Sequence, residues 1–355
     1  GYTCQDLFGQ QLLLEKCEES LFKLLDFTRS LQIITIVGMP VMVGSLLMNC
    51  AVVVQGGKIL GMVPKTYLPN YKEFYEKRWF APSTAINDTQ IHLCAQTVTF
   101  GRNLLFHTQK TCFGIEICED LWTPVPPSSW HALAGADVVV NLSASNELLM
   151  KHRYRQELVA NQSARTVSGY IYVSSGYGES TQDLVFAGSS LVYENGVLLA
   201  ENERFALGDS MIMADLDIEK LQNLRRKEST FDAVAPDGRR ASSFRHGYSL
   251  VEVGEAADTD FGELLLRRVE SHPFVPEGDP SGIDSRAREI VSIQVLGLVT
   301  RLEHVGCRTA VLGISGGLDS TLALLVTVLA FDKLGWDRKR IIGVTMPGLG
   351  TTMRT

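Results

Sequence analysis

The sequence lacks the features that would place it outside the ordinary globular proteins. Its seven cysteines include no Cys-x-x-Cys pair and are odd in number, so neither a disulfide framework nor a zinc cluster is indicated. No apolar run is long enough to span a bilayer, and the first residues do not form a signal peptide. The net charge of −7 disfavours binding to nucleic acids and anionic membranes. We therefore expect a protein of the reducing cytoplasm that acts on small molecules.

The chain is long enough for two domains. Its 355 residues are 45% hydrophobic and 21% charged, which is typical of globular proteins. A polar stretch containing glycine and proline begins near residue 254 and interrupts the apolar pattern. We predict a first domain at 1–255, a linker at 256–282 and the start of a second domain at 283–355. The chain begins with Gly1 and stops at Thr355 just after a predicted strand, so we expect a fragment.

The first domain alternates short apolar strands with helical stretches, which indicates an α/β fold. Glycine pairs at 56–57 and the Asn-Gly pair at 195–196 predict tight turns. Strands are predicted at 33–43, 50–54, 59–63, 112–117, 138–142, 169–174 and 189–193, and helices at 12–30, 129–134 and 147–164. Asn146 is expected to cap the last of these helices.

A glycine-rich loop at residues 315–320 (SGGLDS) stands between an apolar strand at 309–314 and an apolar helical run near 322–330. Small residues, hydroxyls and a helix N-terminus there predict a phosphate site. No Gly-Lys pair precedes the hydroxyl residue, so this is not a Walker loop. An ordinary strand-to-helix turn is the alternative. With helix 283–305 and strand 341–346, the loop forms one βαβ unit, which cannot cover both faces of a parallel sheet.

Two polar residues stand at the ends of apolar strands in the first domain. Cys118 follows the strand at 112–117, and Lys65 follows the strand at 59–63 between two prolines. A thiol in such a loop can serve as a nucleophile, although most cysteines at strand ends are structural. Lys65 alone would suggest a solvated edge charge. Glu76 lies in a charged cluster soon afterwards.

Together these residues resemble the nitrilase, or carbon–nitrogen hydrolase, superfamily. Residues 114–120 (GIEICED) are similar to its nucleophile strand and residues 64–69 (PKTYLP) to its lysine loop. The resemblance implies an αββα sandwich in which Cys118 attacks an amide carbon. Lys65 and a backbone N–H near Glu119 would stabilise the oxyanion, and Glu76 would be the supporting glutamate. The family's general base is a Glu upstream of a Gly-Tyr pair, here Gly1-Tyr2, so it would lie before residue 1.

The segment 141–145 (NLSAS) followed by Lys151 resembles the glutamine pocket of nitrilases fused to a synthetase. In that branch these residues hold the α-amino and α-carboxylate groups of glutamine. The resemblance implies glutamine-binding roles for Tyr2, Tyr71, Glu119, Ser145 and Lys151. For Arg153 and Arg155, a surface charge and a carboxylate clamp both remain open.

The second domain resembles the N-type ATP pyrophosphatases, which implies the start of a Rossmann-like parallel α/β fold. Asp319 would help to arrange Mg²⁺, and the backbone of Met346 would contact adenine. The ATP-binding residues implied by the resemblance are Gly313, Ile314, Ser315, Gly316, Gly317, Leu318, Asp319, Ser320 and Met346.

Both modules in this order are similar to the glutamine-dependent NAD⁺ synthetase family. The family resemblance implies that glutamine is hydrolysed through a cysteine thioester and that ammonia is channelled to deamido-NAD⁺ adenylated by ATP, yielding NAD⁺. It also implies a homo-oligomer. Without the upstream Glu, the chain as given is expected to be inactive. A stand-alone amidase and a non-catalytic subunit are the alternatives.

Overall fold

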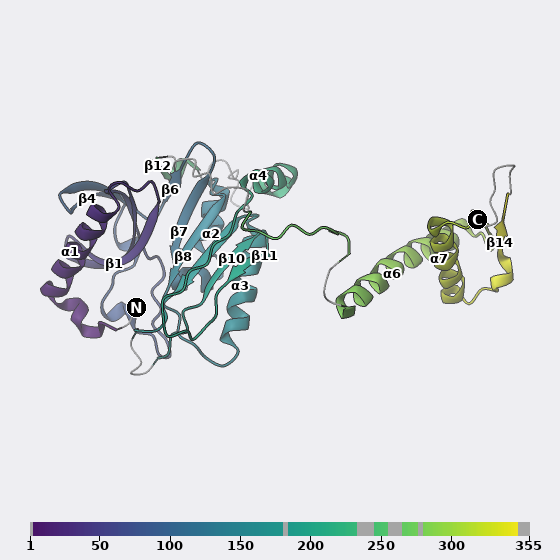
Figure 1. Ribbon diagram of the computed structural model, residues 1–355, viewed down its shortest axis with the longest axis horizontal. Helices are drawn as coiled ribbons and strands as arrows, with labels where there is room; N and C mark the ends of the chain where they lie inside the picture. The colour runs from purple at the N-terminus through teal and green to yellow at the C-terminus, as the bar shows by residue number, and fades with distance from the viewer. Residues whose placement is uncertain (1–2, 180–183, 233–244, 255–264, 276–279, 347–355) are drawn as a thin grey trace. The chain divides into compact units, whose positions relative to one another are not determined.

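The computed structural model describes residues 3–179, 184–232, 245–254, 265–275 and 280–346 (Figure 1). It divides into two compact units, Gly1–Arg268 and Val269–Thr355, and this boundary falls within the predicted linker 256–282. No helix in the described ranges is long and apolar enough to cross a membrane.

The first sheet of the first unit has the strand order β1-β2-β3-β5-β4. Its strands are β1 (Thr35–Val43), β2 (Leu46–Gln55), β3 (Lys58–Pro64), β4 (Thr89–Leu93) and β5 (Gln96–Phe100). β1, β2 and β3 are antiparallel neighbours joined by short turns. Helix α1 (Gln11–Phe27) packs on one face of this sheet through Leu21 and Leu25, as Figure 1 shows at its left.

The second sheet has the order β11-β10-β9-β8-β7-β6-β12. Its strands are β6 (Leu104–His107), β7 (Cys112–Ile117), β8 (Val138–Ser143), β9 (Gly169–Ser174), β10 (Ser190–Glu194), β11 (Val197–Glu201) and β12 (Ser249–Glu252). Helices α2 (Pro127–Leu133) and α3 (Lys151–Arg165) lie along its outer face, and α4 (Ile218–Lys227) follows β11 in sequence (Figure 1). β7, β8 and β9 are parallel, so the loops after β7 and β8 emerge at the same edge.

The two sheets pack face to face, which gives the predicted αββα sandwich. Successive residues of β2 point to opposite faces. Cys50 and Val52 belong to the cluster beneath α1, whereas Ala51 and Val53 join Phe106 of the second sheet. Because both faces of β2 are covered, nearly every residue of the strand is apolar.

Every predicted strand and helix of the first domain is present; β7 and β9 have the predicted ends, and the ends of the others are shifted. The sequence patterns missed β4, β5, β6, β11, β12 and α4, which are short or half exposed. The helix predicted at 147–164 begins only at Lys151, because Met150 has a left-handed φ of 65° that a helix cannot include. The predicted cap at Asn146 is therefore wrong, since Met150 is the N-cap residue.

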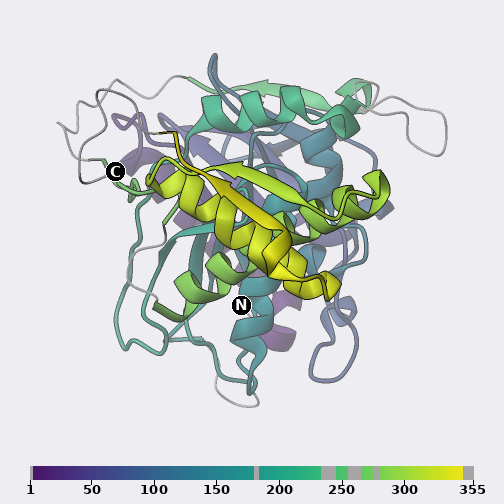
Figure 2. The ribbon, with the colours of Figure 1, turned by 90° about the vertical axis from the view of Figure 1, so that its right-hand side faces the viewer.

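The second unit contains α6 (Pro280–Val305), β13 (Ala310–Gly313), α7 (Leu318–Leu334) and β14 (Ile341–Val344). β13 and β14 are parallel neighbours, and α7 packs on both strands and on α6 (Figure 2). Gly335, with φ of 66°, ends α7 in the left-handed conformation that favours glycine. This arrangement is the predicted βαβ unit.

Several segments of the chain form single turns of 3₁₀ helix. These are η1 (Gln5–Gly9), η2 (Glu76–Arg78), η3 (Ser83–Ala85), η4 (Cys118–Trp122), η5 (Ser229–Asp232), η6 (Arg245–Gly247) and η7 (Arg338–Arg340). Two of them carry residues that the sequence singled out, because η4 begins with Cys118 and η2 begins with Glu76.

Candidate active site

Cys118 is the first residue of η4 and directly follows β7, at a sharp turn of the backbone. Its φ of 49° lies in the left-handed region, which is uncommon for a residue with a side chain. Its backbone N–H donates to Asn141 Oδ1 on the neighbouring strand β8, at 3.2 Å. Such conformations persist only where surrounding contacts enforce them, and they cluster at functional sites. The buried residue at this turn lines two cavities.

Lys65 and Glu76 form a buried ion pair beside this thiol. Lys65 Nζ lies 2.7 Å from Glu76 Oε2, and the two residues are only 1% and 5% exposed. Burial by itself would lower the pKa of Lys65, but a thiolate at Cys118 and the carboxylate of Glu76 outweigh it, and the pKa is raised. The lysine is therefore held as a cation within the site.

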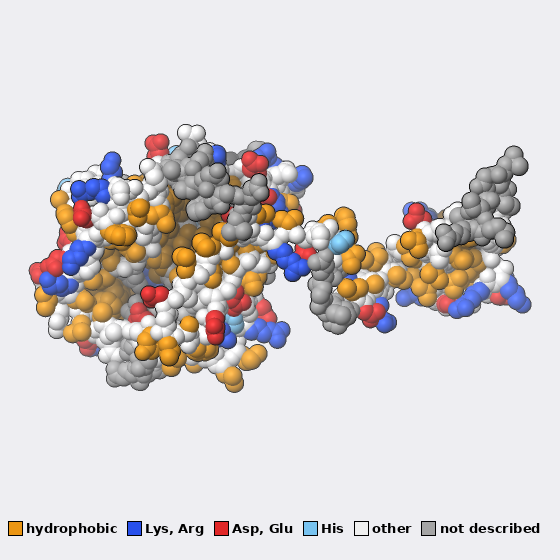
Figure 3. Space-filling view, in the orientation of Figure 1, with side chains coloured by type: hydrophobic (Ala, Val, Ile, Leu, Met, Phe, Trp, Pro, Cys, Tyr) orange, Lys and Arg blue, Asp and Glu red, His pale blue; other side chains and the backbone are white. Residues whose placement is uncertain are grey.

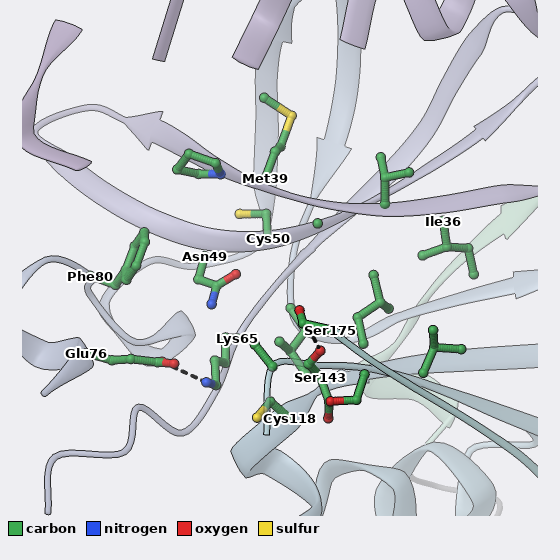
Figure 4. A pocket seen from close by; sticks show the side chains of 18 of the residues that line it. Ile36, Met39, Asn49, Cys50, Lys65, Glu76, Phe80, Cys118, Ser143 and Ser175 are labelled. Carbon is green, nitrogen blue, oxygen red and sulfur yellow. Dashed lines mark hydrogen bonds and ion pairs between the residues drawn. The ribbon is translucent and has the colours of Figure 1, made fainter. Parts of the chain in front are cut away.

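A cavity of about 520 Å³ opens beside these three residues. Figure 4 shows Lys65 pointing toward Glu76, with Cys118 nearby and Ser143 and Ser175 farther along the wall. Most of the remaining wall is apolar and comes from both sheets. Figure 3 shows hydrophobic side chains gathered in hollows on one face of the unit. A cavity of this size and character is typical of small-molecule sites.

A second cavity, of about 250 Å³, is also lined by Cys118. Four of the residues predicted to bind glutamine line it: Tyr71, Glu119, Ser145 and Lys151. Tyr2, the fifth, lies outside the described residues. The general base that the resemblance implies is not assigned to any residue of this sequence.

Charged groups of both signs line this second cavity. Tyr71 donates to Glu119 Oε1 at 2.8 Å, and burial raises the pKa of Glu119. Lys151 Nζ donates to Asn146 Oδ1 at 2.6 Å, and Asn146 in turn donates to Glu73 at 2.8 Å. Burial and the charge of Arg155 lower the pKa of Lys151. An ammonium and carboxylates around one small cavity suit a zwitterionic ligand.

Lys151 is also held by aromatic rings. Its Nζ lies 5.6 Å from the ring centre of Phe74 and 5.4 Å from that of Trp122, within the range of cation–π attraction. Neither ring was predicted to belong to the site. The charged residues next to Phe74 and Trp122 in the sequence do not indicate that these rings contact Lys151.

The structure separates the two arginines that the sequence left undecided. Arg153 is exposed on α3 and pairs with Glu157 one turn later. Arg155 is fully buried, donates to Glu147 Oε1 at 2.7 Å and lies 3.4 Å from Ser145 Oγ. Its Nε has no partner in the described structure. Arg155 thus supports the wall of the second cavity from behind, a role that sequence spacing alone does not reveal.

The loop at 315–320 joins β13 to the N-terminus of α7. Ser315 Oγ lies 3.2 Å from Ser320 Oγ and accepts from the N–H of Gly317 at 3.3 Å. Gly316 has a φ of 80°, so glycine is required there. Asp319 lies in the first turn of α7. The loop is exposed, as a site for a bound anion at a helix N-terminus requires.

The other residues predicted for ATP fall around this loop or on the neighbouring strand. Gly313 ends β13 opposite Val344 of β14, Ile314 donates to Val344 O at 2.8 Å, and Leu318 begins α7. Met346 is exposed just beyond β14. Within the described residues no group of three metal-ligating side chains surrounds Asp319.

The two-sheet αββα sandwich holds a buried cysteine, lysine and glutamate beside one cavity. Residues 3–226 match the family model of the carbon–nitrogen hydrolases, and the chain belongs to this family. Residues 290–355 match the NAD synthase family. The prediction of both modules is thereby confirmed.

Curated relatives align with all or part of this chain. The glutamine-dependent NAD(+) synthetase of Mycobacterium tuberculosis is 40% identical over 364 residues, which cover all of this chain and 52% of the relative. The enzyme of Mycobacterium leprae is 39% identical with the same coverage. That of Rattus norvegicus is 32% identical over 240 residues, which cover 65% of this chain and 33% of the relative. The chain thus spans about half the length of the mycobacterial relatives.

Solved structures share the fold. A glutamine-dependent NAD(+) synthetase from Cytophaga hutchinsonii aligns with a TM-score of 0.54 and 22% identity, covering 94% of this chain and 44% of that one. The synthetase from Acinetobacter baumannii, in complex with ADP, aligns with a TM-score of 0.52 and 21% identity, covering 100% and 52%. A carbon–nitrogen hydrolase from Helicobacter pylori aligns with a TM-score of 0.52 and 22% identity, covering 64% and 77%.

Proposed function

We propose that the full-length protein is a glutamine-dependent NAD⁺ synthetase, which amidates deamido-NAD⁺ with nitrogen taken from glutamine. The observation that carries the proposal is the pairing of two sites on one chain. Cys118, Lys65 and Glu76 line one cavity, Cys118 also lines a second cavity that carries charges of both signs, and a separate βαβ unit carries an exposed glycine-rich loop. An amidase acting alone would give this second unit no purpose.

In the first site, the Cys118 thiolate attacks the side-chain amide carbon of glutamine. The carbon–sulfur bond forms, the carbon–nitrogen bond breaks, and the nitrogen leaves as ammonia after it gains a proton. Water then hydrolyses the thioester to glutamate and restores the thiol. The ammonium of Lys65, held by Glu76, faces the charge that develops on the carbonyl oxygen. The glutamate expected before residue 1 would move the protons.

The second cavity would hold the amino-acid end of glutamine. We assign the contacts with its α-carboxylate and α-amino groups to Ser145 and Lys151, with Tyr71 and Glu119 along the wall. Cys118 lines the same cavity, so a ligand seated there would reach the thiol with its amide. The small volume of about 250 Å³ favours an amino acid over a larger amide.

In the second unit, we assign the phosphates of ATP to the loop at 315–320 and the adenine contact to Met346. ATP use is supported by the NAD synthase match and by the exposed amides and hydroxyls at the start of α7. Bound Mg²⁺ would lower the charge repulsion among the phosphates. Asp319 would supply one carboxylate, and phosphate oxygens and water would fill the other positions. We further propose a cytoplasmic homo-oligomer.

An isotope experiment tests the proposal. The full-length protein is given ATP, deamido-NAD⁺ and glutamine labelled with ¹⁵N at the side-chain amide, in the presence of unlabelled ammonium. The expected product is NAD⁺ that carries the label in its carboxamide at a fraction above that of the free ammonium pool. Formation of glutamate without any NAD⁺ would show that the protein is an amidase alone.

A further inference from the structure

We propose that Asp120 is a positioning residue for the amide hydrolysis proposed above, on which this inference rests. Its carboxylate fastens the loop that carries Lys65 to the turn that carries Cys118. Lys65 follows a strand of the first sheet and Cys118 follows a strand of the second. The relative placement of the oxyanion-stabilising cation and the nucleophile therefore depends on contacts between the sheets.

The contacts of Asp120 reach both sides of the site. Oδ1 accepts from the backbone N–H of Tyr67 at 2.7 Å and from that of Thr66 at 3.2 Å, directly after Lys65 in sequence. Oδ2 accepts from the backbone N–H of Ile117 at 2.9 Å, directly before Cys118. One side chain thus ties together two backbone segments that flank the two reacting groups.

The burial of Asp120 shows that this arrangement is costly for the fold. The residue is 2% exposed, and within the described structure its carboxylate forms no ion pair within 4.0 Å. Burial raises its pKa to about 7, although the hydrogen bonds from backbone N–H groups favour the ionised form and lower the pKa. Burying a carboxylate with amide donors as its only hydrogen-bond partners is expensive. A neutral side chain could be buried there at a lower cost in free energy. We therefore attribute the carboxylate to the positioning of the site rather than to the stability of the core.

The remaining anchors of Lys65 do not link it to the nucleophile. Its backbone N–H donates to Asn49 O of β2 at 2.8 Å, and its carbonyl accepts from Ser83 N at 2.9 Å. Neither partner lies on the second sheet. Without the carboxylate of Asp120, the loop would keep its place on the first sheet but lose the buried hydrogen bonds that tie residues 66 and 67 to the Cys118 turn, and the exposed hydrogen bond from Tyr71 to Glu119 would remain. A displacement of about 1 Å between reacting groups is enough to cost roughly 100-fold in rate.

The test compares Asp120→Asn with a matched control, Asp137→Asn, in the full-length protein. Asp137 is also buried and accepts from a backbone N–H, that of Cys112 at 3.1 Å, but it lines neither cavity. The kcat and KM of glutamine hydrolysis are measured at equal folded fractions. For Asp120→Asn we expect kcat to fall about 100-fold with KM changed less than about threefold, because Asp120 is not among the residues of the glutamine cavity. The control should keep its kcat.

A loss of kcat in Asp120→Asn that is no greater than in Asp137→Asn would overturn the inference. So would a rise in KM at constant kcat. If the parent protein does not hydrolyse glutamine, the proposed function fails. The positioning role of Asp120 can still be tested by alkylation of Cys118 with iodoacetamide, followed by mass spectrometry. Because Lys65 beside the thiol favours the thiolate, Asp120→Asn should be alkylated about tenfold more slowly than Asp137→Asn. Equal alkylation rates in the two variants would contradict the positioning role of Asp120.

Discussion

The ion pair of Lys65 and Glu76 gives the sharpest prediction about stability and catalysis together. Glu76→Gln leaves the ammonium of Lys65 in the same place but removes the charge that lies 2.7 Å from it. Both residues are almost fully buried, so solvent does not screen the loss. Breaking a buried pair by removing one partner costs about 3–5 kcal/mol, and we expect the free energy of unfolding to fall by that amount.

The same change should weaken catalysis. Without the carboxylate of Glu76 and its hydrogen bond, only a thiolate at Cys118 and the more weakly acting Asp120 would oppose the effect of burial, so the pKa of Lys65 falls and the cation loses its proton more readily. Losing one group that stabilises the oxyanion costs about 100-fold to 1,000-fold in kcat. We expect this loss in glutamine hydrolysis, with little change in KM, because Lys65 and Glu76 do not line the glutamine cavity.

The assay is urea unfolding at fixed pH, with steady-state glutamine hydrolysis measured on the same preparations. Glu157→Gln is the control, since Glu157 pairs with Arg153 on the surface of α3 and exposed pairs contribute about 0–1 kcal/mol. The double variant Lys65→Met/Glu76→Gln should be more stable than Glu76→Gln alone, because the isolated charge is gone. A cost for Glu76→Gln no larger than that of the control would refute the buried pair.

The remaining predictions concern three separate parts of the chain. Burial lowers the pKa of His131 to about 4, so between pH 6.5 and 4 the unfolded state binds a proton that the folded state refuses. Stability should fall by roughly 3 kcal/mol as the pH drops through that window, and a His131→Gln variant that kept this slope in urea unfolding would contradict the assignment. Arg155→Lys cannot keep the forked contacts with Glu147 and Ser145, so the KM for glutamine should rise about tenfold, equivalent to about 1.4 kcal/mol, and an unchanged KM would disprove its support of the cavity. Asp319→Asn should suppress NAD⁺ formation from glutamine and from ammonia alike, and retained synthesis from ammonia would exclude Asp319 from the ATP site.

Local sequence patterns predicted the strands that end beside Cys118 and Lys65, whereas the roles proposed for these two residues came from the resemblance to a family. Cys118 and Lys65 each end an apolar strand, and the strands at 112–117 and 59–63 were predicted because buried strands are continuous runs of apolar residues. The pattern that predicted the loop at 315–320 also involves only neighbouring residues, since its glycines and hydroxyls lie between one strand and one helix. Such features depend on near neighbours in the chain.

The supporting residues could not be predicted, because their roles arise from contacts between distant segments. Asn141 supports Cys118 only because β7 and β8 are parallel neighbours in register. Arg155 lies in a helix of strongly polar sequence and is buried by packing against β9 and β10, which no local pattern reveals. Strands β4 and β5 are short and rich in threonine and glutamine, so their alternation was too weak to detect.

The central claim is that one chain carries two chemically separate sites, and that ammonia released at the first is consumed at the second. Its most direct test is NAD⁺ formation by Cys118→Ala in the full-length protein, supplied with either glutamine or ammonium. Cys50→Ala is the control, because this buried thiol lines the larger cavity but burial holds its pKa far above neutrality. We expect Cys118→Ala to abolish synthesis from glutamine and to leave synthesis from ammonium intact, whereas the control keeps both. Equal loss of both activities in Cys118→Ala would contradict the two-site account.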